Sequence, residues 1–182
     1  MPRPVTWWCR GPGHSLQGLL GFSLVGTLAT VAILGILLAI SAPRFSESIE
    51  RTRLKHAAEA LSSHLDLVRM ETVRRNSDLT VSCVTGKTWC VGIDDAGTCD
   101  CSASGDCNIR RFLGDQLASD VTLSTTYSSS SGLVFDRIRG SATNGSFTFT
   151  TSSGYDLRVV LSGRGRIRIC SPSGNVPGYT PC

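Results

Sequence analysis

The chain has 182 residues, eight cysteines and a formal net charge of +4, with 41% hydrophobic and 18% charged residues. This length is enough for one domain with one core, beside a short N-terminal segment. No second domain, tandem repeat or long charged tail is expected from the sequence.

The first predicted element is an apolar helix over residues 22–42. No charged side chain lies between Arg10 and Arg44, and at about 1.5 Å per residue this helix is long enough to cross a bilayer. Arg3 and Arg10 precede it, so the positive-inside rule keeps them cytoplasmic and directs the C-terminal part outward. Residues 43–182 are therefore expected to form an anchored, exported globular domain.

The start of this helix resembles the processing site of type IV pilins and pseudopilins. The order Gly21-Phe22-Ser23-Leu24, an apolar helix and then Ala42-Pro43 is that of a prepilin-peptidase substrate, whereas a secretory signal peptide is cut after its apolar stretch. The resemblance implies a leader of residues 1–21, cleavage after Gly21 and N-methylation of Phe22. It also implies that the helix is retained, first in inner-membrane lipid and then in a filament core.

One residue departs from this family pattern. Pilins usually carry glutamate at the fifth mature position, where the family is thought to pair it with the N-terminal ammonium group of a neighbouring subunit in the apolar filament core. This chain has Gly26 there, so it offers no partner charge. The departure favours a minor subunit over a major pilin, and poor assembly stays open as an alternative.

After Pro43 the sequence predicts a helix that continues to about Asn76. Apolar residues recur every three or four positions and form a stripe that needs a partner surface, and Arg74 and Arg75 suit a helix C-terminus. The residues of the stripe are Leu54, Ala58, Leu61, Leu65 and Val68.

Beyond Ser77 the sequence predicts strands and turns. Asn144-Gly145 and Ser153-Gly154 are expected to be turns between antiparallel strands, and the Ser/Thr-rich segment 122–132 is expected to be a loop. The fold class is therefore α+β and type IV pilin-like, with one long N-terminal helix packed on an antiparallel β-sheet. The expected strands cover residues 79–83, 89–93, 133–135, 146–150, 157–161 and 166–170.

Seven cysteines remain after removal of the leader that contains Cys9. Disulfides form and persist in an exported domain. Cys170 and Cys182 are expected to pin the Pro/Gly-rich tail between them, and seven is odd, so one thiol is spare or pairs between chains. The candidates are Cys83, Cys90, Cys99, Cys101, Cys107, Cys170 and Cys182.

Two of the pairings are left open by spacing. Cys83 and Cys90 flank a predicted turn and are candidates for a bridge between adjacent strands, and either Cys99 or Cys101 is close enough to Cys107. A zinc site is the rival for the last three, but a fourth ligand is missing and the C-x-C spacing is unlike common structural zinc motifs. Disulfides are favoured, and no metal or other cofactor is predicted.

Further motifs narrow the resemblance to the GspH/FimT group of minor pilins and pseudopilins. They are the segment 67–76, a strand that ends in cysteine, and Trp89-x-x-Gly92. Gly163-Arg164-Gly165-Arg166 matches the Gly-Arg-x-Arg signature of FimT, the minor pilin implicated in binding DNA for natural transformation. The resemblance implies double-stranded DNA, other pilin or pseudopilin subunits and the prepilin peptidase as partners. It also implies a single-pass inner-membrane protein with a periplasmic domain, at the cell surface once assembled in a pilus.

The chemistry of these arginines agrees with a DNA contact. Arg166 and Arg168 are two apart on a predicted strand, so both project from one face about 6.7 Å apart, and Arg164 extends the row. Guanidinium groups form forked hydrogen bonds with phosphate, and glycine permits close approach of a nucleic-acid backbone. From Ser131 to Cys182, six arginines face two aspartates. The predicted DNA-binding residues are Gly163, Arg164, Gly165, Arg166 and Arg168.

The same arginines are also compatible with a purely structural role, since charges on an edge strand discourage aggregation. Few aromatics flank them, so phosphate-dominated binding of duplex DNA is expected rather than stacking on single-stranded bases. An enzyme is not expected, because the mature chain has only His56 and His64 and no recognisable catalytic set. Two hypotheses remain: a minor pilin that captures DNA, and a structural pseudopilin of a type II secretion system.

Overall fold

The computed structural model describes residues 23–114, 118 and 120–182, without the side chains of residues 40–44. The predicted leader, Gly21 and Phe22 lie outside the described residues. The chain divides into two compact units, Met1–Ser41 and Ala42–Cys182, and helix α1 (Leu24–Arg75) contributes residues to both. Within the described part of the chain, no helix combines the length and the apolar character needed to cross a membrane.

In the unit Ala42–Cys182, α1 buries the predicted apolar stripe. All five of its side chains, from Leu54 to Val68, are at most 3% exposed. The helix ends where Asn76 adopts a positive φ of 52°. The amide of Ser77 then donates to the Thr72 carbonyl and the amide of Asn76 to the Val73 carbonyl, both at 3.3 Å, which is the paired hydrogen bonding of a Schellman C-cap. The predicted helix end is confirmed.

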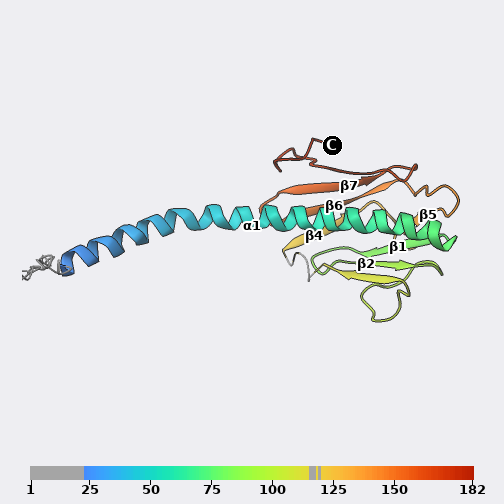
Figure 1. Cartoon of the computed structure of the whole chain (residues 1–182), viewed down its shortest axis with the longest axis horizontal. Helices are drawn as coiled ribbons and strands as arrows, with labels where there is room; N and C mark the ends of the chain where they lie inside the picture. Colours follow the sequence, from blue (N-terminus) through green and yellow to red (C-terminus); the bar gives the residue numbers. More distant parts are fainter. Residues whose placement is uncertain (1–22, 115–117, 119) are drawn as a thin grey trace, which may run out of the picture. The chain divides into compact units, whose positions relative to one another are not determined.

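The strands form two antiparallel four-stranded sheets against α1 (Figure 1). One sheet has the order β3-β2-β1-β5 and the other β4-β6-β7-β8. The strands are β1 (Leu79–Val84), β2 (Cys90–Asp94), β3 (Arg110–Leu113), β4 (Val121–Thr125), β5 (Leu133–Phe135), β6 (Gly145–Thr151), β7 (Asp156–Leu161) and β8 (Ile167–Cys170).

The helix-on-antiparallel-strands architecture is confirmed, but the strands divide between two sheets. β5 pairs with β1, whereas β6 pairs with β4 and β7, so the segment between β5 and β6 crosses from one sheet to the other. Asn144-Gly145 therefore ends this crossover and does not form a hairpin turn. Ser153-Gly154 does connect the paired strands β6 and β7, and Gly154 has a φ of 82°.

The predicted loop over 122–132 is wrong in its first part. β4 pairs along its whole length with β6, and its residues alternate, with Val121 and Leu123 buried in the core. The abundance of serine and threonine in this segment was misleading, because β-branched threonine fits a half-exposed strand well. β3 was also not predicted; only two of its four residues are even partly buried.

The core lies between α1 and the two sheets. Trp89, Phe135, Phe147 and Phe149 are its largest fully buried side chains. The Trp89 indole donates to the carbonyl of Val121 at 3.0 Å, so its polar edge is satisfied inside the core. This packing fixes the positions of the strands in both sheets, and therefore of the residues on their outer faces.

Three disulfides hold the loops, and they correct one predicted pairing. Cys170 bonds Cys182, and Cys99 bonds Cys107, but Cys90 bonds Cys101 and Cys83 is free. A Cys83–Cys90 bridge is wrong because Cys83 lies opposite Val91 and Cys90 lies opposite Val84, which places the two cysteines on opposite faces of the sheet. All three sulfurs of the Cys99–Cys107 cluster are in disulfides.

Candidate nucleic-acid interface

The predicted arginine row lies on the outer face of the sheet β4-β6-β7-β8. β8 begins at Ile167, and Arg168 lies opposite Val160 of β7. Ile167 and Ile169 alternate with the arginines and pack against the core, while Arg166 and Arg168 are exposed. Because β8 is at the edge of the sheet, this row is accessible to a large partner.

Apart from Val160, the rest of this sheet face is polar and almost without acidic groups. Arg158 of β7 donates from Nε to the Thr148 hydroxyl at 3.1 Å, so it is held flat along the sheet. Asp156 lies at the other end of β7, where its carboxylate accepts hydrogen bonds from Ser173. The hydroxyl-bearing residues of the face are Thr122, Ser124, Ser146, Thr148 and Thr150.

The Gly-Arg-Gly-Arg motif forms the turn between β7 and β8. The amide of Ser162 donates to the Arg166 carbonyl at 3.0 Å, and the amide of Gly165 donates to the Ser162 carbonyl at 2.8 Å. Gly165 has a φ of 73°, as expected for the last residue of a three-residue hairpin loop. Arg164 is exposed at this turn. One glycine of the motif is therefore required by the backbone, whatever the turn binds.

The side chain of Arg69, in α1, holds this turn in place. Its Nη1 donates to the carbonyl of Gly165 at 3.2 Å, and its side chain passes beside Gly140, where an added Cβ would lie 3.2 Å from Nε. A Cβ at Gly165 would also overlap the main-chain oxygen of Gly140. Sequence reasoning missed Arg69, because it is polar and adjoins the apolar stripe, so periodicity placed it on a solvated face.

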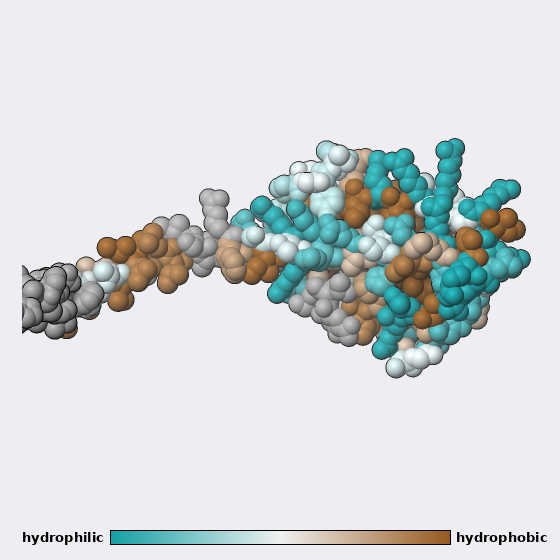
Figure 2. All heavy atoms as spheres, in the orientation of Figure 1, coloured by the Kyte–Doolittle hydropathy of each residue, from teal (hydrophilic) through white to brown (hydrophobic). Residues whose placement is uncertain are grey.

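The charges of the row are not neutralised. Among the residues that the structure describes, Arg164, Arg166 and Arg168 form no ion pair, since the described ion pairs all involve Arg51, Arg53, Arg74 or Arg75. Figure 2 shows hydrophilic and hydrophobic patches mixed over this unit, with a few long hydrophilic side chains that project from its edge. A free guanidinium group in water is an available donor for a phosphate group.

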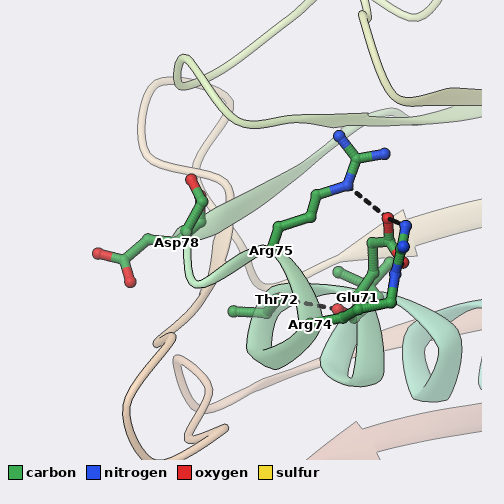
Figure 3. Close-up of polar contacts among 7 residues, drawn as sticks. Glu71, Thr72, Arg74, Arg75 and Asp78 are labelled. Carbon is green, nitrogen blue, oxygen red and sulfur yellow. Dashed lines mark hydrogen bonds and ion pairs between the residues drawn. The ribbon is translucent and has the colours of Figure 1, made fainter.

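The arginines at the end of α1 differ from this row. Figure 3 shows Arg74 and Arg75 directed at Glu71, with Asp78 apart from them. Arg74 makes two hydrogen bonds to the Glu71 carboxylate, at 2.7 and 2.5 Å, and Arg75 donates a third. These hydrogen bonds, with Arg74 the larger contributor, hold the pKa of the Glu71 carboxyl at about 2. This cluster is internally compensated and offers less free positive charge than the row.

A family model agrees with this fold. The model described as Type II transport protein GspH matches residues 57–165, which is more than half of the chain. The match begins in α1, covers β1 to β7 and ends at Gly165, inside the Gly163–Arg166 turn and before β8.

Three solved structures are similar to this chain. The minor pseudopilin EpsH from the Type 2 Secretion System of Vibrio cholerae has a TM-score of 0.50 at 15% identity, with 66% of this chain and 98% of EpsH covered. The type IV minor pilin FimU of Pseudomonas aeruginosa has a TM-score of 0.49 at 25% identity, with coverage of 71% and 96%. For E. coli GspH the values are 0.45 and 13%, with coverage of 70% and 94%. The similarity to EpsH shows a shared fold.

Proposed function

Because the chain belongs to the GspH family of pilin and pseudopilin subunits, we propose that it is a minor type IV pilin that binds extracellular double-stranded DNA for uptake in natural transformation. The observation that supports this proposal is the exposed, unpaired row of Arg164, Arg166 and Arg168 on an edge strand. Gly163 and Gly165 lack side chains that would obstruct the approach of DNA to the adjoining turn. Binding is phosphate-dominated, independent of sequence and sensitive to salt.

Assembly and location are part of the same proposal. Other pilin subunits are its partners in the assembled filament. The prepilin peptidase cuts after Gly21, and Phe22 becomes the methylated N-terminus. Residues 22–42 lie in inner-membrane lipid before assembly and in the filament core afterwards. The domain 43–182 is periplasmic and reaches the cell surface within a pilus.

A structural pseudopilin of a type II secretion system is the second candidate. It is supported by the match to the family of Type II transport protein GspH and by the fold shared with EpsH, a minor pseudopilin of the Type 2 Secretion System. In that case the globular unit contacts neighbouring subunits, and the arginine row keeps the edge strand β8 from pairing with other chains. The two candidates differ in whether removal of the row changes DNA uptake.

The test is a transformation assay in the host with the gene deleted and complemented. The variant Arg164→Ala/Arg166→Ala/Arg168→Ala is compared with Arg53→Ala/Arg110→Ala/Arg111→Ala, which removes three exposed arginines elsewhere on the same unit. The first variant should lose most of the transformation frequency while pili and type II secretion persist, and the second should behave like wild type. Full transformation by the first variant, with secretion lost on deletion, would favour the pseudopilin.

A further inference from the structure

A second basic turn lies directly beside the Gly163–Arg166 turn. It is the crossover between β5 and β6, and at its tip it exposes Arg137, Ile138 and Arg139. Ile138 is 78% exposed, more than any other large apolar side chain described in the unit Ala42–Cys182. No core contact explains why the turn presents these three side chains to solvent.

The backbone of this turn is rigidly held. The Asp136 carboxylate accepts hydrogen bonds from the amides of Ile138 and Arg139, each at 2.9 Å. The amide of Gly140 donates to the Asp136 carbonyl at 2.9 Å, and the amide of Arg137 donates to the Asp78 carboxylate at 2.9 Å. The arginine side chains take no part in these bonds, so their replacement should leave the turn intact.

The two turns are joined to each other. The amide of Ala142 donates to the carbonyl of Gly163 at 3.3 Å. The oxygen of Gly140 lies within overlap distance of where a Cβ of Gly165 would be, and the side chain of Arg69 contacts both turns. This arrangement holds the two turns side by side, so Arg137 and Arg139 lie on a turn that adjoins the one carrying Arg164 and Arg166.

The combined surface is positively charged. Within the described part of the chain, neither Arg137 nor Arg139 forms an ion pair. The nearby carboxylates of Asp78 and Asp136 are occupied by the amides of the turn itself. Four exposed arginines on two adjoining turns therefore outnumber the two nearby aspartates, Asp78 and Asp136.

We propose that the turn 136–140 is a second phosphate-binding element, so that one DNA duplex is contacted at once by Arg137 and Arg139 and by the arginines of the β7–β8 turn. This inference rests on the proposed DNA binding and extends it to residues outside the Gly-Arg-x-Arg motif. Ile138 separates the two arginines and contributes no charge to the contact.

The salt dependence of binding measures the number of phosphate contacts. Each contact adds about 0.9 to the slope of log K against log salt concentration on duplex DNA. The full-length protein in nonionic detergent is titrated with a fluorescent duplex at four salt concentrations. Arg137→Ala/Arg139→Ala should lower the slope by about 1.8 and weaken binding by up to about 60-fold at 0.1 M salt.

Two controls separate charge from structure. Ile138→Ser alters the same turn without a change in charge and should keep the wild-type slope. Arg110→Ala/Arg111→Ala removes two exposed arginines from β3 and should also keep it. A lowered slope for Ile138→Ser would attribute the effect to disruption of the turn, and a lowered slope for Arg110→Ala/Arg111→Ala would attribute it to net charge. Either result would overturn the inference.

The remaining outcomes are distinguishable. If wild type binds and the Arg164/Arg166/Arg168 variant loses binding, but Arg137→Ala/Arg139→Ala keeps the wild-type slope and affinity, only the second element is wrong. If wild type does not bind duplex DNA at the lowest salt concentration, the proposed function fails and this inference fails with it.

Discussion

Nη1 of Arg69 lies 3.2 Å from the carbonyl oxygen of Gly165 and donates a hydrogen bond to it. This contact joins the C-terminal part of α1 to the turn that carries the Gly-Arg-Gly-Arg motif, 96 residues later in the chain. It makes the position of the exposed arginines depend on the packing of α1.

Arg69→Ala should therefore weaken DNA binding without removing a residue of the motif. The Gly165 carbonyl loses this donor, which should lower the free energy of unfolding by about 1 to 2 kcal/mol, and the turn becomes less ordered. Urea denaturation and DNA titration of the same preparation check both effects. Arg69→Lys should restore part of the affinity, and equal binding by all three proteins would contradict the positioning role.

Gly165→Ala should destabilise the protein by about 1 to 3 kcal/mol. Alanine at a φ of 73° is strained, and its Cβ overlaps the oxygen of Gly140. Gly154→Ala is the matched control, because Gly154 has a φ of 82° but open space around an added Cβ. Thermal unfolding should show a smaller loss for Gly154→Ala, and similar losses would mean that the close approach of the two turns is unimportant.

Much of the fold was predictable from the sequence, and the exceptions have physical causes. The stripe from Leu54 to Val68 predicts the buried face of α1, because helix periodicity reports burial directly. The assignment of strands to two sheets was not predictable, since β5 and β6 are adjacent in the chain but pair with different partners. Periodicity says nothing of which strands pair.

The candidate site was predictable only in its local part. Alternation of arginine with isoleucine over 166–169 predicts an exposed row, and β8 has it. The contribution of Arg69 and the neighbourhood of the turn 136–140 depend on contacts between segments far apart in sequence, for which a single sequence carries no signal. The Cys90–Cys101 pairing was missed because the strand register, which places Cys83 and Cys90 on opposite faces of the sheet, was not known from the sequence.

The stability of the protein should depend on the protonation of Glu71. Its pKa of about 2 is below the ordinary value of 4.5, so the native state binds fewer protons than the unfolded state between these values. The stabilisation by Arg74 and Arg75 is therefore present above about pH 4.5 and lost as the pH falls toward 2. Denaturation of wild type and Glu71→Gln should show a difference at pH 6 that shrinks by pH 2.5. A constant difference would contradict this assignment.

Gly26 provides a test of the filament role. It lies in α1, and an added Cβ there meets nothing within 4 Å, so a longer side chain fits the isolated subunit. Gly26→Glu supplies the carboxylate that the pilin resemblance leads one to expect, and should raise the fraction of the protein found in sheared filaments by immunoblotting. Gly26→Gln controls for helix propensity, which improves by about 1 kcal/mol when glycine is replaced. An equal rise with glutamine would assign the effect to the helix and not to the charge.

The most direct test of the account is a mobility-shift titration of the wild-type protein and the Arg164→Ala/Arg166→Ala/Arg168→Ala variant on duplex DNA at 50 and 200 mM salt. Three phosphate contacts alone predict a wild-type affinity that falls at least about 40-fold over this range, and the variant, with unchanged thermal unfolding, should bind far more weakly at 50 mM. Absence of wild-type binding at 50 mM, or equal binding by the variant, would contradict DNA capture through this row.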